Sequence, residues 1–221
     1  MTDRMESGSL VDFVVDRIEK AILLGDYPAG MKLSEQSLAT ELGVSRSPLR
    51  EAFRRLEGKK LVVRRHNAGA RVAEHSAKEL REVLEIREAL ESYAARKAAE
   101  NMSEEEKAAL LRLVEQQREY ERLGTTVDRN QSPEQDFHLF VIRGSKNDRL
   151  SDMLYGDLYY ALRVLRYRSS AHAGRSRLAI EEHAVVATAI ATGQPEVAEQ
   201  AMRVHLRRSH ENMLNAERTR N

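Results

Sequence analysis

Hydrophobic residues recur at helical spacing near the start of the chain. From Val11 to Ile22 they lie three or four residues apart, so one face of this segment is apolar and the other is polar. That period predicts an amphipathic helix whose apolar face packs on a core. The pattern ends at Gly25 and a Pro28–Gly30 turn.

Two shorter helices are expected next. Ser34 can cap the first of them, and Gly43 ends it. Ser45 can cap the second, which has Pro48 in its first turn, where a missing N–H costs nothing, and which ends at Gly58. The apolar residues of this second helix fall on one face: Leu49, Ala52, Phe53 and Leu56.

Two β-prone runs follow, over residues 61–63 and 71–73. The Gly-containing turn between them, at 66–69, predicts a β-hairpin. Three helices, two of them joined by a tight turn, followed by a hairpin predict a winged helix–turn–helix domain over residues 1–75.

The remainder, residues 76–221, shows helical signals and no strand pattern. A Ser followed three residues later by Glu or Gln forms a capping box, and three such pairs predict helix starts: Ser76 with Glu79, Ser103 with Glu106, and Ser132 with Gln135. Six helices are expected, at 76–100, 103–123, 132–143, 148–170, 175–192 and 195–217. The predicted fold is mostly α: a winged helix–turn–helix followed by an all-helical, six-helix bundle.

The chain is nearly neutral, with 36 Lys and Arg against 35 Asp and Glu, but its charge is uneven. Residues 46–71 hold nine basic and two acidic side chains, a local net charge of +7. This concentration indicates a polyanionic partner, although an ordinary solvated surface is the alternative. The chain has no Cys, no apolar run of the roughly 18 residues that a membrane span needs, and a polar N-terminus. A soluble cytoplasmic protein without a membrane partner is therefore expected.

The helix after the tight turn has side chains suited to reading DNA. In such a motif the N-terminal end of the second helix enters the major groove. Arginine can hold guanine O6 and N7 with two parallel hydrogen bonds, and small hydroxyl groups suit phosphates. A winged helix that docks a protein is the alternative. The residues expected to contact DNA are Ser45, Arg46, Ser47, Arg50 and Arg54 of the helix, and His66 and Gly69 of the hairpin tip.

The same segment carries a family resemblance. Residues 42–56 read LGVSRSPLREAFRRL, and LSE precedes them at 33–35. On these motifs residues 11–73 resemble the DNA-binding domain of the GntR family of bacterial transcription regulators. Two positions depart from the family pattern: Gln36 and Ala68 stand where many relatives have Arg. The resemblance implies a homodimer that binds double-stranded DNA at a pseudo-palindromic operator.

A second resemblance covers the helical remainder. Residues 86–91 read IREALE, FH stands at 137–138 and EH at 182–183. From 78 to 212 the chain resembles the FCD effector domain of FadR-like GntR regulators, in its six-helix, VanR-type version. The resemblance implies that residues 76–221 form an effector-binding and dimerisation domain. It also implies a repressor controlled by a small organic acid.

Three histidines lie on apolar faces of three expected helices: His138, His183 and His205. Such histidines are usually core residues, but with Glu134 four residues before His138 they also form a donor set for a zinc-like divalent ion. Chemistry alone leaves both interpretations open. The resemblance implies a metal site of one carboxylate and three histidines in this order, with Glu134 where relatives have Asp. Zinc is the expected ion, with nickel and manganese as alternatives.

Arg87 and Asn147 are the expected effector-binding residues. The guanidinium of Arg87 matches a carboxylate, although a surface salt bridge with Glu91 is the alternative; Asn147 follows from the resemblance alone. The chain contains no HExxH, GxSxG or phosphate-loop motif, so no enzyme is expected. Three further hypotheses stay open: a regulator for which the ion itself is the signal, a metabolite-binding protein whose DNA contact is incidental, and a metal hydrolase.

Overall fold

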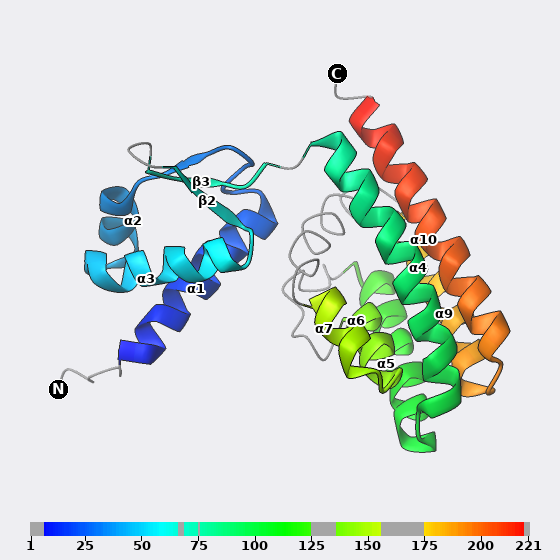
Figure 1. Ribbon diagram of the computed structural model, residues 1–221. Helices are drawn as coiled ribbons and strands as arrows, with labels where there is room; N and C mark the ends of the chain where they lie inside the picture. Colours follow the sequence, from blue (N-terminus) through cyan, green and yellow to red (C-terminus); the bar gives the residue numbers. More distant parts are fainter. Residues whose placement is uncertain (1–6, 66–68, 75, 125–135, 156–174, 219–221) are drawn as a thin grey trace. The chain divides into compact units, whose positions relative to one another are not determined.

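The computed structural model describes residues 7–65, 69–74, 76–124, 136–155 and 175–218. The chain is mostly helical, as predicted, and forms two compact units, Met1–Ser76 and Ala77–Asn221. They run from blue to cyan and from green to red in Figure 1. The boundary between them lies one residue from the one expected from the sequence.

The first unit contains the expected helix–turn–helix. Its helices are α1 (Ser7–Leu24), α2 (Glu35–Leu42) and α3 (Arg46–Gly58). Its strands are β1 (Lys32–Leu33), β2 (Val62–Arg65) and β3 (Gly69–Val72), which pair antiparallel in the order β1-β3-β2. The hairpin of β2 and β3 was predicted, whereas β1 was not, because two residues are too few to show an alternating pattern. The predicted apolar face of α1 is buried: Val11, Val14, Val15, Ile18 and Ile22.

The turn between α2 and α3 depends on a left-handed glycine. Gly43 has φ 65°, and its N–H donates to the carbonyls of Ala39 and Thr40 at the end of α2. Glycine adopts this conformation without the steric cost that other residues have there. Ser34 caps α2 as predicted, since its hydroxyl accepts the N–H of Ser37. Ser45 occupies the predicted N-cap position of α3, but its side chain forms no capping hydrogen bond, so that part of the prediction was wrong.

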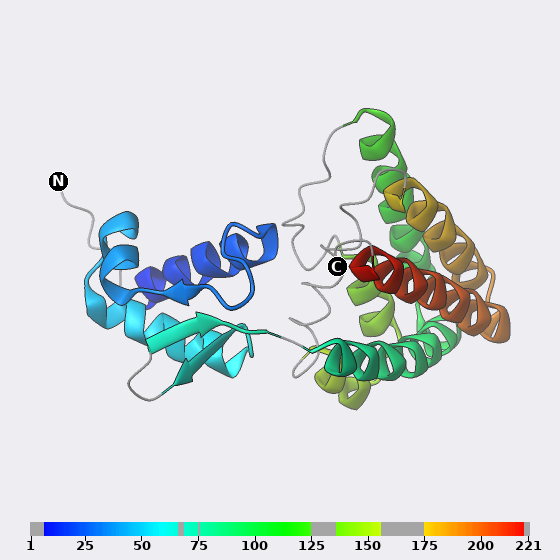
Figure 2. The same ribbon diagram turned by 90° about the horizontal axis from the view of Figure 1, so that it is seen from above.

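The second unit is a helical bundle. In its described part six helices are present, as expected: α4 (Ala77–Asn101), α5 (Glu104–Arg122), α6 (Phe137–Gly144), α7 (Asp148–Tyr155), α9 (Arg175–Ala191) and α10 (Pro195–Arg218). α10 lies alongside both α4 and α9 (Figures 1 and 2). The capping box of Ser103 and Glu106 is confirmed at the start of α5. Residues 156–170 of the helix predicted at 148–170 lie outside the described residues.

The start of α6 differs from the prediction. The helix begins at Phe137 instead of residue 132, because Asp136 has an extended backbone and serves as its N-cap. The carboxylate of Asp136 accepts the N–H groups of His138 and Leu139, which would otherwise lack partners in the first turn. The predicted capping box of Ser132 and Gln135 lies outside the described residues.

Small residues on α4 allow the bundle to close. Four buried positions toward the C-terminal end of this helix are alanines: Ala94, Ala95, Ala98 and Ala99. Side-chain size at a contact sets the distance between two packed helices, so these alanines allow a close approach. The core around Ala95, Ala98 and Ala99 includes Phe137, Ile190 and Met202, from α6, α9 and α10. These three helices also carry the histidines expected to bind a metal.

Candidate nucleic-acid interface and metal centre

The residues expected to contact DNA share the exposed face of α3. Ser45, Arg46, Ser47, Arg50 and Arg54 are all exposed. The opposite face packs into the core of the unit through the residues predicted from the sequence: Leu49, Ala52, Phe53 and Leu56. The fold therefore leaves the N-terminal half of α3 accessible on the side where its cations lie.

The arginines on this face have acidic or amide partners within the unit. Arg50 Nε donates to Glu35 Oε2 at 2.9 Å, and Arg46 Nη2 donates to Gln36 Oε1 at 3.2 Å. Both partners are at the start of α2, so α2 holds the two arginines that were expected to read bases. The local charge of +7 is thus partly compensated by residues outside the basic segment.

Arg54 pairs within its own helix. Its Nε and Nη2 donate to the two carboxylate oxygens of Glu51, at 2.9 and 2.6 Å. These hydrogen bonds lower the pKa of Glu51 to about 2, and Arg55 adds to the effect. Glu51 therefore stays ionised throughout the neutral pH range.

The β2–β3 hairpin lies beside the start of α3. Gly69 is the first residue of β3 and has φ 76°, whereas His66 lies outside the described residues. Gly69 and Arg46 line the same open hollow of about 630 Å³, together with Lys32 and Arg64. The structure thus places wing and helix residues around one partly cationic hollow.

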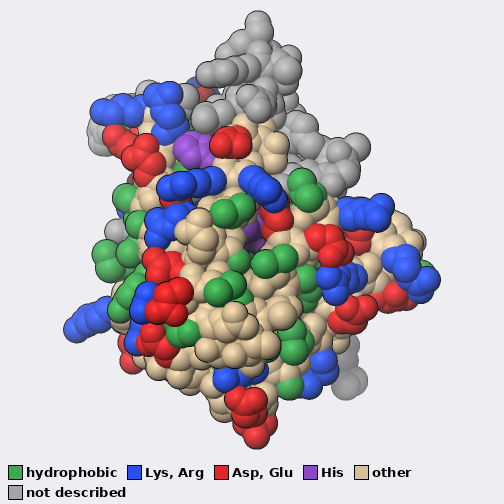
Figure 3. Space-filling view, turned by 90° about the vertical axis from the view of Figure 1, so that its right-hand side faces the viewer, with side chains coloured by type: hydrophobic (Ala, Val, Ile, Leu, Met, Phe, Trp, Pro, Cys, Tyr) green, Lys and Arg blue, Asp and Glu red, His purple; other side chains and the backbone are tan. Residues whose placement is uncertain are grey.

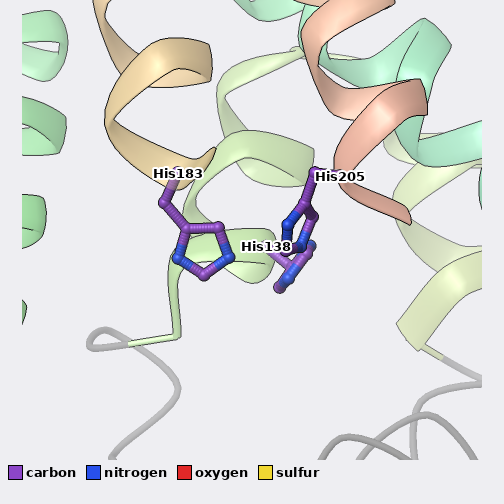
Figure 4. A group of neighbouring side chains, drawn as sticks. All are labelled: His138, His183 and His205. Carbon is purple, nitrogen blue, oxygen red and sulfur yellow. The ribbon is translucent and has the colours of Figure 1, made fainter. Parts of the chain in front are cut away.

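In the second unit the three predicted histidines meet. His138 comes from α6, His183 from α9 and His205 from α10, and the rings point toward one another (Figure 4). Their candidate ligand atoms all lie within 4.8 Å of one another, and their ring centroids are 4.6–5.2 Å apart. His138 and His205 are buried and His183 is half-buried. The ring of Phe137 stacks on His183 at 4.0 Å and holds its orientation.

Each histidine has a side-chain oxygen at its Nδ1 atom. The pairs are Glu91 Oε2 with His138 at 2.6 Å, Glu182 Oε2 with His205 at 2.7 Å, and Gln117 Oε1 with His183 at 3.4 Å. An oxygen acceptor at Nδ1 favours the tautomer with the proton there, which leaves a lone pair on Nε2. Three imidazoles in that state are a donor set that suits zinc, so the residues present fit the implied ion.

Arg87 joins this cluster. Its Nε donates to Glu91 Oε1 at 2.6 Å, and the two side chains are only 2% and 1% exposed. Its Nη2 lies 3.2 Å from both ring nitrogens of His138. The alternative of a surface salt bridge was therefore half correct, because the partner is Glu91 but the pair is buried. A similar contact joins Arg208 to Glu182 at 3.3 Å.

Two further site residues were expected. Glu134 lies outside the described residues, and α6, which carries His138, begins at Phe137. Asn147 lies between α6 and α7, where its side-chain oxygen accepts the N–H of Leu150 at 3.1 Å. That is the hydrogen bond of a helix N-cap.

The oxygens at Nδ1 could not be recognised from the sequence. Gln117 lies in no motif, Glu182 was noted only as part of the EH motif, and Glu91 only as a partner of Arg87. The pairs Glu91–His138 and Glu182–His205 are 47 and 23 residues apart in the sequence. Periodicity reports which face of a helix is apolar and carries no information on such long-range partners.

Comparison with known proteins gives the chain its family. Residues 10–72 match the family described as "Bacterial regulatory proteins, gntR family", and residues 82–208 match the FCD domain. The chain belongs to the GntR family. This GntR-family protein is a DNA-binding transcriptional regulator of the FCD type, and the families and relatives that it matches are regulators rather than enzymes.

Relatives match almost the full length of the regulator. It is 30% identical over 211 residues to the "Probable D-xylose utilization operon transcriptional repressor" of Paenarthrobacter nicotinovorans, which covers 92% of this chain and 88% of the relative. It is 24% identical over 237 residues to the Glc operon transcriptional activator of Escherichia coli, covering 96% and 92%. Both signs of regulation thus occur among its relatives.

Solved structures share the fold. McbR/YncC of E. coli has a TM-score of 0.74 at 21% identity, and the match covers 95% of this chain and 99% of that one. A GntR regulator of Rhodococcus sp. RHA1 has a TM-score of 0.70 at 21% identity, covering 94% and 99%. Among the helices of the regulator that the structure describes, none is both long and apolar enough to cross a membrane.

Proposed function

We propose that this regulator represses transcription as a homodimer on a pseudo-palindromic operator, and that a small carboxylate-bearing metabolite controls its affinity for DNA at a metal site in the FCD domain. The observation that carries the proposal is the meeting of His138, His183 and His205 beside the buried cation of Arg87. A metal ion and a fixed guanidinium are two groups that bind a carboxylate.

Exposed ion pairs support the DNA-reading role of α3. Arg50 is 62% exposed in its pair with Glu35, and pairs of this kind contribute little to stability. Arg46 and Arg50 can therefore leave their α2 partners for base edges without a large cost. The side chain of Ser45 does not cap α3, so the N–H groups of the first turn are suited to a phosphate.

His138, His183 and His205 would hold the ion, and Glu134 is proposed as the fourth ligand. Zinc suits the donors best, with nickel or manganese as alternatives. When bound, the ion supplies a Lewis-acidic position for an effector carboxylate. Arg87 would bind the same carboxylate from α4, and Asn147 remains a proposed contact on the resemblance alone.

Effector binding would favour one arrangement of the regulator over another. The change in operator affinity cannot exceed the difference in effector affinity between the two arrangements. The named repressor among the relatives supports a repressor here. A second candidate, in which the ion itself is the signal, uses the same histidines without an organic acid.

An apolar groove supports a homodimer. Val185, Val197 and Val204 are 58%, 49% and 37% exposed, and they line a groove of about 460 Å³ formed by α9 and α10. Hydrophobic side chains also lie among charged ones on the face of the molecule shown in Figure 3. Exposed apolar patches of this kind commonly mark protein interfaces.

Metal analysis and DNA binding test the proposal together. Purified wild-type protein, loaded with zinc and desalted, should retain the ion, whereas His183→Ala should lose it and His210→Gln, on α10 outside the cluster, should not. An operator selected from random oligonucleotides is then titrated with zinc-loaded and chelator-treated protein, with and without a panel of organic acids. We expect one acid to weaken operator binding only when zinc is present.

Three results would contradict parts of this proposal. Unchanged metal content in His183→Ala removes the metal site. A response to chelator alone, with no response to any acid, favours the ion as the signal. Selection without any preferred DNA sequence removes the base-reading role of α3.

A further inference from the structure

Two of the three histidines are held by buried carboxylates from other helices. Glu91 on α4 contacts His138 on α6, and Glu182 on α9 contacts His205 on α10. The side chains of Glu91 and Glu182 are 1% and 8% exposed. Packing therefore fixes the hydrogen-bond partners of both carboxylates.

Each of these carboxylates also has an arginine on its second oxygen. Arg87 donates to Glu91 Oε1 at 2.6 Å, while Glu91 Oε2 faces the imidazole. The other pair repeats this order, with Arg208 on Glu182 Oε1 at 3.3 Å and His205 on Oε2. The arrangement arginine–glutamate–histidine thus occurs twice around one cluster, built from different helices.

The chemistry of this arrangement selects one tautomer. An ionised carboxylate can only accept hydrogen bonds, so an oxygen 2.6–2.7 Å from Nδ1 requires a proton on that nitrogen. In a neutral ring Nε2 then carries the lone pair, and in His138 this atom lies 3.2 Å from the Arg87 Nη2 donor, which an ion would have to displace. Histidines that ligate metals commonly have their other nitrogen bound in this way, and loss of the carboxylate typically weakens metal binding 10- to 100-fold.

We propose that Glu91 and Glu182 are positioning residues that fix His138 and His205 in the Nδ1–H tautomer and turn both Nε2 atoms toward one divalent ion. The inference rests on the metal site in the proposed function and goes beyond it, since neither glutamate is a ligand. The two arrangements differ in exposure, because Arg87 is buried and Arg208 is 56% exposed. Losing Arg208 is therefore expected to affect zinc binding less than losing Glu182.

The tautomers can be observed without metal. In ¹⁵N-labelled full-length protein, at a pH where the ¹⁵N shifts show both rings to be neutral, the ring nitrogens of His138 and His205 should show protonated Nδ1 and unprotonated Nε2. Glu182→Ala should remove this preference in His205 and leave it in His138. Glu182→Gln should retain it, because the amide oxygen still accepts a hydrogen bond. Protonated Nε2 in the wild type would overturn the inference.

Zinc affinity provides the second measurement. In competition with a chromophoric chelator, Glu182→Ala should bind zinc about 10- to 100-fold more weakly than wild type, with Glu182→Gln in between. The matched control is Glu181→Ala, which removes the neighbouring exposed carboxylate that pairs with Arg118 and should leave zinc affinity unchanged. Thermal unfolding of the metal-free proteins shows whether each variant is folded. A Glu91→Gln variant tests the other carboxylate in the same way. If that variant does not fold, the Glu182 variants still test the inference.

The outcomes separate this inference from the proposed function. If wild type binds zinc and Glu182→Ala binds it equally well, the positioning role is wrong and the metal site stands. If wild type binds no divalent ion, the metal site is wrong and the positioning role falls with it. Equal loss of affinity in Glu181→Ala and Glu182→Ala would also contradict the inference, because an unspecific charge effect would then explain both.

Discussion

Both units of the regulator use arginine–carboxylate pairs, but in opposite surroundings. On α3 the side chains of Arg54 and Glu51 are 70% and 36% exposed. In the FCD domain those of Arg87 and Glu91 are 2% and 1% exposed, at the same N···O distance of 2.6 Å. Water screens the first pair and is excluded from the second, so similar geometry implies very different energies.

The difference corresponds to the roles proposed for the two units. A DNA-reading arginine has to exchange its partner when a phosphate or a base arrives, and a weak, exposed pair allows that exchange. A site that orients imidazoles has to keep its geometry, and a buried pair resists change because a lone buried charge is costly. Exposure, more than distance, distinguishes exchangeable pairs from fixed ones.

The largest effect is expected from breaking the buried pair. Arg87→Ala leaves the carboxylate of Glu91 buried without its cation, which typically costs about 3–5 kcal/mol of stability. Chemical denaturation of the metal-free protein should show this loss. The matched control is Arg122→Ala on α5, where Arg122 and Glu119 are 72% and 50% exposed; it should leave stability nearly unchanged, because exposed ion pairs contribute little. Equal losses in both variants would contradict the comparison.

A smaller effect is expected at the N-terminal end of α3, which is proposed to read DNA. Arg46→Ala should weaken operator binding by about 1–3 kcal/mol and leave binding to random DNA nearly unchanged, because a base contact carries the sequence preference. Competition titrations with both DNAs give this ratio. Unfolding should be unaffected, since Arg46 is exposed. Equal weakening on both DNAs would show that Arg46 contacts only the backbone.

Arg54 provides the contrast within the same helix. Arg54→Ala should weaken binding to operator and random DNA alike. The negative slope of the logarithm of the binding constant against the logarithm of salt concentration should become less steep by about 1. The salt series distinguishes this result from that of Arg46→Ala. A change in sequence preference would instead indicate that Arg54 reads a base.

The exposed face of α3 could be predicted because it depends on local spacing, whereas the grouping of His138, His183 and His205 from three helices was expected from the family resemblance. Residues three or four apart share a helix face, so the burial of Leu49 and Phe53 follows from the sequence, as does the exposure of Arg46. The partners of these side chains could not be predicted. Glu35 reaches Arg50 across the turn between α2 and α3, and Glu91 reaches His138 from another helix.

The start of α6 shows where local rules conflict. Ser132 with Gln135 forms a capping pattern, and Asp136 is an equally good cap four residues later. In the structure Asp136 is the N-cap of α6, and its carboxylate accepts the N–H groups of His138 and Leu139. Spacing alone does not decide between two such caps.

The smallest effect is expected from the acidic partner of Arg54. Glu51→Gln removes a carboxylate that competes with DNA phosphates for this guanidinium, so affinity for operator and random DNA should rise, by at most about fivefold for an exposed pair. The matched control is Glu119→Gln, which removes the same kind of i,i+3 pair from α5 and should leave DNA binding unchanged.

The pH dependence sharpens this last test. The pKa of Glu51 is lowered to about 2 by the hydrogen bonds of Arg54. A lowered pKa means that the pair is complete above the ordinary range of a glutamate, near 4.3, and is lost only as the pH falls toward 2. Between pH 5 and 8 the ratio of affinities of Glu51→Gln and wild type should therefore stay constant. A ratio that falls toward 1 on acidification to pH 5 would show that Glu51 is already protonated there. The hydrogen bonds of Arg54 would then not lower the pKa of Glu51 to about 2.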